Sequence, residues 1–255
     1  MKLTVIGCSG SYPGPDSPAS CYLLEAEEET PEGARTWRLA LDMGNGALGW
    51  LQRSVDPLML DGVLLSHLHA DHCLDLASFY VMRKYHPDGP QLRLPVWGPK
   101  DTANRMARAY DLPKDPGMHA EFDFRTYPED LRIGPFQVEA VPVDHPVEAY
   151  GLRITSGGRT LAYTGDTALC ANLARLAADA DLLLAEASFR EGDDNPGSIH
   201  LTGRDCGRLA AEVGAARLVI THVPPWFDPR DMLVEAQGVW DGPVELASQG
   251  RVFEV

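Results

Sequence analysis

The sequence predicts an α/β (α+β) fold in which two β-sheets pack against each other and helices cover their outer faces. Two observations lead to this prediction. Strands, marked by period-two alternation and β-branched residues, occur in two blocks, and helical periodicity follows each block. With 255 residues, of which 44% are hydrophobic, the chain can bury a large core. We therefore expect one domain over residues 1–255.

The first block contains the expected strands of one sheet. They lie near residues 2–7, 21–26, 36–42 and 60–65, and helical periodicity follows at 72–85 and 101–110. The acidic stretch Glu25–Glu32, with Pro31-Glu32-Gly33, is expected to be a solvated hairpin loop. The segment Met1–Gly7 is expected to be a strand rather than a signal peptide, because it lacks an apolar core of roughly 7–15 residues.

The second block supplies the other sheet. Strands are expected at 121–127, 136–143, 149–155 and 159–164. Helices and strands then alternate, with helices at 168–178, 203–213 and around 229–237, and strands at 181–186 and 217–221. Closing strands are expected near 243–246 and 251–254.

Charge and cysteine content limit the expected partners and compartment. The 22 basic and 37 acidic residues give a net charge of −15, so the surface repels polyanions, and long nucleic acids are not expected as partners. A small anion is still compatible with this charge, because bound cations make a pocket locally positive. The five cysteines are scattered without a Cys-x-x-Cys pair, which favours a reducing cytoplasm. No apolar run approaches the roughly 20 residues of a membrane span.

One glycine motif suggests a nucleotide site. Gly44-Asn45-Gly46-Ala47-Leu48-Gly49 matches the dinucleotide-binding pattern Gly-x-Gly-x-x-Gly and follows a strand ending at Asp42. The preceding strands, however, resemble antiparallel hairpin partners rather than the start of a parallel β-α-β unit. We interpret the motif as a tight turn into a helix.

The strongest functional signal is the run His67-Leu68-His69-Ala70-Asp71-His72, between an expected strand and an expected helix. In extended backbone His67 and His69 point to the same side. Asp71 and His72, at the turn into the helix, can point to a second position a few ångströms away. Two adjacent metal ions fit this pattern better than one ion. The alternative, a polar loop whose histidines cap the helix, would suit a single histidine better.

Four further polar residues lie near the ends of expected elements: His145, Asp166, His200 and His222. Ligands at several strand ends converge on one edge of a sheet, which is a common place for a site. Taken singly, His145 or His222 could be structural, and Asp166 could be a helix N-cap. Together they form a set of imidazoles and carboxylates without thiolates, which suits zinc, manganese or iron.

These residues resemble the motifs of the metallo-β-lactamase superfamily. The likeness is carried by His67-x-His69-x-Asp71-His72, followed by His145, Asp166 and His222. It implies a four-layer αββα sandwich with the site at one edge. Four further segments resemble the ribonuclease Z-like branch of this superfamily: Thr164-Gly165-Asp166-Thr167, Glu186-Ala187-Ser188, His200-Leu201-Thr202 and Thr221-His222.

Within that branch the sequence is most similar to the actinobacterial atypical class II-like cyclic-nucleotide (cAMP) phosphodiesterases. Four segments carry this similarity: Gly7–Ser11, Pro15–Ser20, Ser66–Leu76 and Thr221–Trp226. The tRNA-processing enzymes of the branch carry a long arm between the residues that correspond to His145 and Asp166. Here only 20 residues separate the two, enough for two strands and a turn.

The resemblance implies a ligand set and a mechanism. His67, His69 and His145 would hold one divalent ion, Asp71, His72 and His222 would hold a second, and Asp166 would bridge them. We expect zinc, with manganese or iron as alternatives. Two ions about 3.5–4 Å apart can share a hydroxide that attacks phosphorus. Asp71 would also orient that hydroxide.

Other residues are expected to support the reaction or contact substrate. His200 would protonate the leaving oxygen, unless it is only a loop residue that caps a helix. Glu186 would orient His200 or a ligand, or else serve as a buried capping carboxylate. Asp42 is expected to have a similar supporting role. Trp226 and Tyr150 could stack on a base or pack their own loops, and Ser11 lies in one of the similar segments.

These inferences predict a phosphodiesterase that hydrolyses 3′,5′-cyclic nucleotides, cAMP first and cGMP second, to 5′-monophosphates. The alternatives are a tRNA 3′-processing endonuclease, another ester hydrolase on the same metal frame, and a metal-bound sensor or scaffold without activity. The family resemblance also implies a homodimer.

Overall fold

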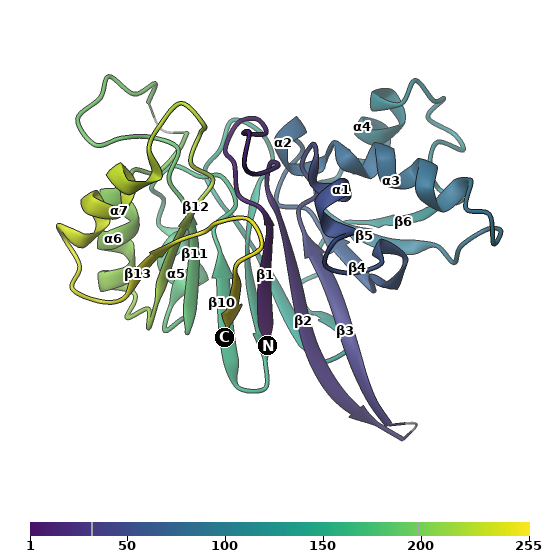
Figure 1. Cartoon of the computed structure of the whole chain (residues 1–255), viewed down its shortest axis with the longest axis horizontal. Coiled ribbons are helices and arrows are strands. Elements are labelled where there is room, and N and C mark those ends of the chain that lie inside the picture. Colours follow the sequence, from purple (N-terminus) through teal and green to yellow (C-terminus); the bar gives the residue numbers. More distant parts are fainter. Residues whose placement is uncertain (32, 198) are drawn as a thin grey trace.

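A computed structural model describes residues 1–31, 33–197 and 199–255. Two seven-stranded sheets face each other, and helices cover the outer face of each (Figure 1). This four-layer arrangement confirms the predicted fold class. No helix among the described residues is long and apolar enough to cross a membrane.

The first sheet has the strand order β14-β1-β2-β3-β4-β5-β6. Its strands are β1 (Lys2–Gly7), β2 (Cys21–Thr30), β3 (Gly33–Leu41), β4 (Gly62–Leu64), β5 (Leu94–Trp97), β6 (Phe122–Arg125) and β14 (Val252–Glu254). Its helices are α1 (Ala47–Leu51), η1 (Pro57–Met59, a 3-10 helix), α2 (Ala70–Cys73), α3 (Asp75–Lys84) and α4 (Thr102–Ala109).

The second sheet has the order β13-β12-β11-β10-β9-β8-β7. Its strands are β7 (Leu131–Ile133), β8 (Phe136–Pro142), β9 (Tyr150–Ser156), β10 (Arg159–Tyr163), β11 (Leu182–Glu186), β12 (Leu218–Thr221) and β13 (Val244–Leu246). It is covered by α5 (Asn172–Ala177), α6 (Gly203–Glu212) and α7 (Pro229–Gln237).

The layers follow from the two-residue period of the strands. In β11, Leu182 and Leu184 point into the core between the sheets, while Leu183 and Ala185 face the helices. Both faces of these central strands are therefore apolar. Burial on both faces explains why β11 and β12 are nearly continuous runs of hydrophobic residues in the sequence.

The topology brings several strand ends to one edge. Strands β3 to β6 are parallel, and so are β10 to β13. Strand β8 is antiparallel to β9, which is antiparallel to β10, so β8 ends at the same edge as β10. Polar residues that follow these strands are therefore collected at one rim of the sandwich.

The acidic segment after residue 25 differs from the expectation of a loop. It continues β2 to Thr30, and the β2–β3 ribbon extends beyond the body of the molecule (Figure 1). Partners on β3 make this possible, because Arg38 Nε lies 3.2 Å from Glu25 Oε1 and Trp37 Nε1 donates to Glu28 over 2.9 Å. Glu32, in the predicted turn, lies outside the described residues.

Other boundaries also differ from the sequence-based expectations. Strands β5 and β7 were not expected, because they are only four and three residues long. The strand expected at 121–127 joins the first sheet as β6, and the closing strand becomes β14 beside β1. The helix expected at 72–85 is divided into α2 and α3, and the one expected at 168–178 begins only at Asn172.

Candidate metal centre

The histidine run follows β4 and enters α2 at the rim of the sandwich. His67 and His72 are fully buried, Asp71 is nearly so, and His69 is half-buried. Asp71 and His72 lie within the four-residue helix α2, so the start of this helix turns them toward a point different from that of His67 and His69.

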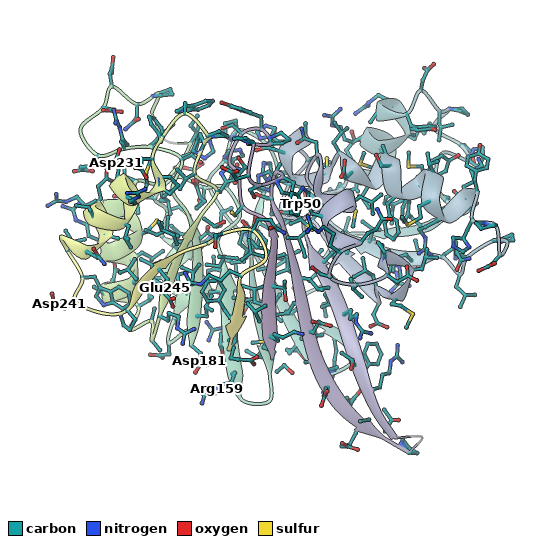
Figure 2. The ribbon with its side chains drawn as sticks, viewed as in Figure 1. Trp50, Arg159, Asp181, Asp231, Asp241 and Glu245 are labelled. Carbon is teal, nitrogen blue, oxygen red and sulfur yellow. The ribbon has the colours of Figure 1, made fainter. Side chains whose placement is uncertain are left out.

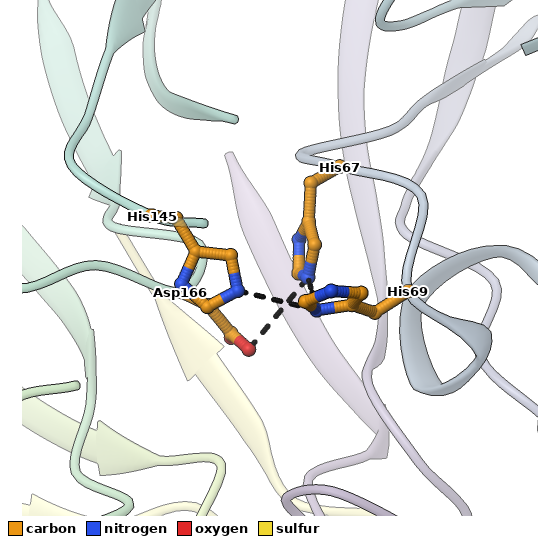
Figure 3. Close-up of side chains that lie close together, drawn as sticks. All are labelled: His67, His69, His145 and Asp166. Carbon is orange, nitrogen blue, oxygen red and sulfur yellow. Dashed lines mark hydrogen bonds and ion pairs between the residues drawn. The ribbon is translucent and has the colours of Figure 1, made fainter. Parts of the chain in front are cut away.

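One group of potential ligands gathers around His67 (Figure 3). Nε2 of His67 lies 3.0 Å from Nδ1 of His69, which lies 3.2 Å from Nε2 of His145. Oδ2 of Asp166 lies 3.7 Å from His67 Nε2. These four ligand atoms all lie within 4.8 Å of one another, although their residues follow three different strands.

A second group lies beside the first and also uses Asp166. Nε2 of His222 lies 3.1 Å from both Nε2 of His72 and Oδ2 of Asp71. Oδ1 of Asp166 lies 3.2 Å from His72 Nε2. The two oxygens of Asp166 thus face different groups, which is the position that the family resemblance implies for a bridging carboxylate.

The ring nitrogens that face the centre carry lone pairs. His72 Nδ1 lies 2.7 Å from a carboxylate oxygen of Asp42, and His145 Nδ1 lies 3.1 Å from the carbonyl oxygen of Ile199. Both partners only accept hydrogen bonds, so each Nδ1 carries the proton and each Nε2 is unprotonated in the neutral ring.

Two serines fix the remaining buried rings in the same way. Ser66 Oγ donates to Asp42, so it can accept from Nδ1 of His67 at 3.0 Å. Ser188 Oγ donates to the carbonyl oxygen of His222 and lies 2.8 Å from Nδ1 of the same ring. In both rings the Nε2 lone pair is therefore directed into the centre.

A cation accounts for these facing acceptors. Three or more lone pairs within hydrogen-bond distance of one another, without protons between them, are stable only around a positive charge. Oδ1 of Asp166 is buried and accepts no hydrogen bond of normal geometry from the described residues. The donor set of imidazoles and carboxylates therefore fits divalent metal ions.

The electrostatics of the ligands are consistent with metal binding. Burial lowers the pKa of His67, His69 and His145, which keeps these imidazoles neutral. Burial by itself would raise the pKa of Asp71 and Asp166, but the imidazoles of His222 and His72 outweigh it and hold both carboxyl pKa values below their usual range. Burial acts to lower the pKa of His72 as well, but the carboxylates of Asp166 and Asp42 outweigh burial and raise that pKa, so a metal ion must displace a proton from this ring. Neutral imidazoles and ionised carboxylates are the protonation states that bind metals.

Asp42 organises one side of the centre from the end of β3. It is fully buried and accepts hydrogen bonds from Ser66 N at 2.7 Å, Ser66 Oγ at 2.8 Å and Tyr163 Oη at 2.7 Å, in addition to the His72 ring. Its backbone adopts φ 57°, a left-handed conformation that is strained for a non-glycine residue. Asp42 thus connects the ligand loop of the first sheet to β10 of the second.

His200 lies beside the two groups and is held by Glu186. Its Nδ1 lies 2.9 Å from Oε1 of the fully buried Glu186, and its ring lies 5.5 Å from that of His145 and 5.9 Å from that of His222. Burial lowers the pKa of His200, but the adjacent carboxylate of Glu186 outweighs burial and raises the pKa to about 9. Glu186 therefore favours the protonated form of His200.

Glu186 is engaged on both of its oxygens. Oε1 accepts from the backbone N–H of Thr167 at 3.1 Å and of Leu201 at 3.3 Å, and Oε2 accepts from Ser188 N at 3.0 Å. Although Glu186, His200 and His222 form a third compact group, this carboxylate is already satisfied by donors. The structure gives it both roles that the sequence left open, orienting His200 and capping local backbone.

The predicted substrate contacts have different surroundings. Tyr150, at the start of β9, donates to Glu148 over 2.7 Å and packs 5.3 Å from Tyr127. Ser11 is exposed and has φ 62°. Trp226 is 57% exposed and lies 5.3 Å from the ring of Tyr12.

Sequence reasoning missed three residues that support the centre, Ser66, Tyr163 and Ser188, and it missed Tyr12, which packs against Trp226. Ser66 and Ser188 are adjacent to predicted functional residues, but their hydroxyl contacts depend on the fold. Tyr163 reads as an ordinary strand residue, because the sequence does not indicate that β10 passes beneath Asp42. No signal distinguished Tyr12 from other surface aromatics.

A cavity elsewhere carries no comparable chemistry. It measures about 580 Å³ and is lined by charged residues that include Lys2, Glu25 and Arg159. Their charges are paired, with 2.6 Å between Lys2 and Glu25 and 2.5 Å between Arg159 and Asp181. Arg159 and Asp181 lie at the lower end of the sandwich in Figure 2, remote from the rim that carries the ligands.

Comparison with known proteins finds a matching family model and relatives that this chain matches over its full length. Residues 41–223 match the family model described as the beta-lactamase superfamily domain. The chain is 43% identical to the uncharacterized protein ML1173 of Mycobacterium leprae, covering 100% of this chain and 89% of that protein. It is 30% identical to the probable metallo-hydrolase YhfI of Bacillus subtilis and 26% identical to ribonuclease Z of Myxococcus xanthus, covering 100% of this chain in both cases and 100% and 98% of those proteins.

Solved structures share the fold. The crystal structure of YhfI from Bacillus subtilis superposes with a TM-score of 0.86 at 29% identity, covering 100% of this chain and 99% of that one. Human tRNase Z, short form, gives a TM-score of 0.77 at 20% identity, and yeast PDE1 gives 0.74 at 14%, each covering 100% of this chain and 99% of the other. At 20% and 14% identity, the last two similarities show a shared fold and nothing more.

Proposed function

The chain belongs to the beta-lactamase superfamily, and from that premise we propose that it is a dinuclear metal-dependent phosphodiesterase. The proposed substrates are 3′,5′-cyclic nucleotides, cAMP first and cGMP second, and the products are 5′-monophosphates. The observation that carries the proposal is a pair of ligand groups that share Asp166, with His200 held beside them by Glu186. That combination suits phosphodiester hydrolysis, in which negative charge develops on the phosphoryl oxygens and the leaving oxygen needs a proton.

The two ligand groups set the position of the reaction. Divalent ions bound there, most suitably zinc with manganese or iron as alternatives, would lower the pKa of a bound water and stabilise charge on the phosphoryl oxygens. The chain itself supplies fixed ring orientations through Asp42, Ser66 and Ser188. These contacts keep the centre in one geometry before substrate arrives.

His200 supplies the proton. With its pKa raised by Glu186, the imidazolium is available at neutral pH to donate from Nε2, because Nδ1 is directed to Glu186. The proton would go to the 3′-oxygen of the ribose as the P–O bond breaks. Without it, that oxygen would leave as an alkoxide, which is a poor leaving group.

Charge and connectivity support a small substrate. The chain has a net charge of −15, so a long polyanion would be repelled over most of its surface. Between His145 and Asp166 the chain forms only β9 and β10, joined by a turn at Gly157 and Gly158. A single phosphodiester needs neither a basic track nor an arm.

Product analysis tests the proposed function. Purified protein loaded with zinc or manganese is incubated with cAMP, cGMP, bis(4-nitrophenyl) phosphate and a precursor tRNA, and Asp166→Ala serves as the inactive control. We expect 5′-monophosphates from the cyclic nucleotides and no trailer release from tRNA. Cleavage of the synthetic diester without cleavage of either cyclic nucleotide would refute the substrate assignment, and efficient trailer release would establish the endonuclease instead.

We also propose, on the family resemblance, that the protein acts as a homodimer in the cytoplasm. Sedimentation of the purified protein tests the first part of this proposal.

A further inference from the structure

An exposed aromatic pair lies on the loops next to the metal centre. Trp226 is 57% exposed and Tyr12 is 42% exposed, and their ring centroids are 5.3 Å apart with 40° between the planes. Phe227 packs edge-on against Trp226 at 6.0 Å. Two large aromatic side chains exposed side by side indicate a binding surface, because a ligand that covers them would gain the free energy of burying apolar area.

The pair is tied directly to a metal ligand. His222 precedes Trp226 by four residues, and the backbone N–H of His222 donates to the carbonyl oxygen of Cys8 over 3.0 Å. Gly10 N donates to Val223 O over 3.1 Å, and Ser9 forms a parallel bridge with Val223. The loop that carries Tyr12 and the loop that carries Trp226 therefore form one unit with the His222 ligand.

That unit is constrained rather than adaptable. A Cβ on Gly10 would lie 2.2 Å from the carbonyl oxygen of His222, so only glycine fits between the loops. His222 and Ser11 both have left-handed backbone, with φ 55° and 62°. Pro224 and Pro225 restrict the segment between His222 and Trp226. The aromatic pair consequently keeps a fixed position relative to the reacting centre.

We propose that Trp226 is the stacking surface for the base of the nucleotide substrate and that Tyr12 is its positioning residue. The inference rests on the proposed function, and it specifies how that site would recognise a nucleotide. The two rings already touch, so a base does not enter between them. It stacks on the exposed part of the indole, while contacts with Tyr12 and Phe227 hold the indole in place.

A flat base fits this surface better than other occupants. A base stacked on an aromatic side chain gains about 1–3 kcal/mol, whichever base it is. The phosphate would lie at the metal centre, and a cyclic nucleotide carries its base within a few bonds of that phosphate. Such a platform predicts tight binding of nucleotides in general and only modest discrimination between adenine and guanine.

Binding of a matched ligand pair isolates the contribution of the base. Dissociation constants of AMP and ribose 5-phosphate are measured by calorimetry on the metal-loaded protein, because the two ligands share the phosphate and ribose and differ only in the base. We expect AMP to bind about 5- to 150-fold more tightly than ribose 5-phosphate. In Trp226→Leu the two constants should agree within about twofold, Trp226→Phe should keep most of the ratio, and Tyr12→Leu should reduce it partly.

Tyr110→Leu is the matched control. Tyr110 is also 42% exposed and also packs against another ring, that of Tyr80 at 5.2 Å, but it lies at the end of α4. Its variant should keep the wild-type ratio. In parallel, Trp226→Leu should raise KM for cAMP by about 5- to 150-fold, with kcat and the turnover of bis(4-nitrophenyl) phosphate changed less than about threefold.

Several outcomes would overturn the inference. Equal binding of AMP and ribose 5-phosphate by the wild-type protein, no binding of AMP at millimolar concentration, or an unchanged ratio in Trp226→Leu would each do so. A change of oligomeric mass in Trp226→Leu without a change in the ratio would assign the pair to a subunit contact. If AMP binds through Trp226 but no cyclic nucleotide is cleaved, the stacking surface stands and the proposed reaction fails.

Discussion

At the residue scale, each buried histidine of the centre has its proton assigned by one neighbour. Asp42 accepts from His72, and Ser66 and Ser188 are each oriented by a donated hydrogen bond so that they accept from His67 and His222. The result is a ring of lone pairs with fixed direction. Metal affinity therefore depends on residues that never touch a metal.

Removing the shared carboxylate should abolish metal binding. In Asp166→Ala both ligand groups lose a member, so we expect loss of bound metal and of activity together, and the same in His67→Ala. In His200→Ala the metal content should stay at the wild-type level, while the rate falls about 10²- to 10⁴-fold because only the proton donor is lost. Metal analysis of the dialysed proteins alongside turnover checks both. Equal metal loss in His200→Ala would show that its assigned role is wrong.

Glu186 should control the titration of His200. Its carboxylate raises the pKa of that imidazole from 6.5 to about 9, so the favourable pairing is complete below about pH 6.5 and is lost as the pH rises through about 9. In Glu186→Gln the pKa of His200 should fall toward 6.5, since burial is then opposed mainly by the charge of Asp166. Titration of the His200 ring by NMR in metal-free protein measures this change. A pKa that stays near 9 in the variant would exclude Glu186 as its cause.

At the element scale, the turn from β3 into α1 shows why a nucleotide-like glycine motif occurs here. A Cβ on Gly44 would lie 2.0 Å from the carbonyl oxygen of Asp71, and Gly46 has φ 84° at the N-cap of α1. Met43 N also donates to the carbonyl oxygen of His72 over 2.7 Å. Gly44 permits the close approach to the metal-binding loop, and Gly46 permits the turn into α1.

Two alanine substitutions in this motif should have opposite effects. Gly44→Ala should displace Asp71 and reduce metal affinity and activity strongly, because the backbone oxygen it meets cannot move without α2. Gly49→Ala, in α1 with nothing within 4 Å of the added Cβ, should leave activity unchanged and stabilise the protein by about 0.5–1 kcal/mol. Chelator competition and thermal unfolding of both variants provide the comparison. Similar activities in the two variants would contradict the assigned contact.

At the scale of the whole molecule, the centre joins the two sheets. His67, His69, Asp71 and His72 follow a strand of the first sheet, whereas His145, Asp166 and His222 follow strands of the second. Beneath them, Tyr163 of the second sheet donates to Asp42 of the first over 2.7 Å. Metal binding at this seam would therefore hold the two halves of the sandwich together.

Metal removal should consequently lower stability as well as activity. Ligand at about 100 times its dissociation constant adds about 2.7 kcal/mol to folding, which corresponds to roughly 5–11 °C in Tm for a chain of this size. Thermal unfolding with and without chelator measures the shift. Asp166→Ala, which should not hold the metals, should show no response to chelator; an equally large shift in that variant would place the stabilising ions elsewhere.

The sequence determined the fold class and named the polar residues that the structure brings together at the rim. The continuous apolar run of a strand buried on both faces, such as β11, is legible without coordinates, and so is a run with four potential ligands in six positions. Local composition gave wrong predictions for segments whose structure depends on their neighbours in the sheet. The acidic end of β2 is a strand because Arg38 and Trp37 lie opposite it, and the short β5 is a strand because β4 and β6 flank it.

Only the tertiary structure decided which hydroxyls fix the protons of the ligands, and that Tyr12 contacts Trp226. The residues in these contacts are far apart in the sequence; Tyr12 and Trp226, for example, are separated by 214 positions. Periodicity and motifs report on a chain's own neighbourhood, within a few turns of helix or one strand. Contacts across the two sheets depend on register and packing, which the sequence expresses only when the whole chain has folded.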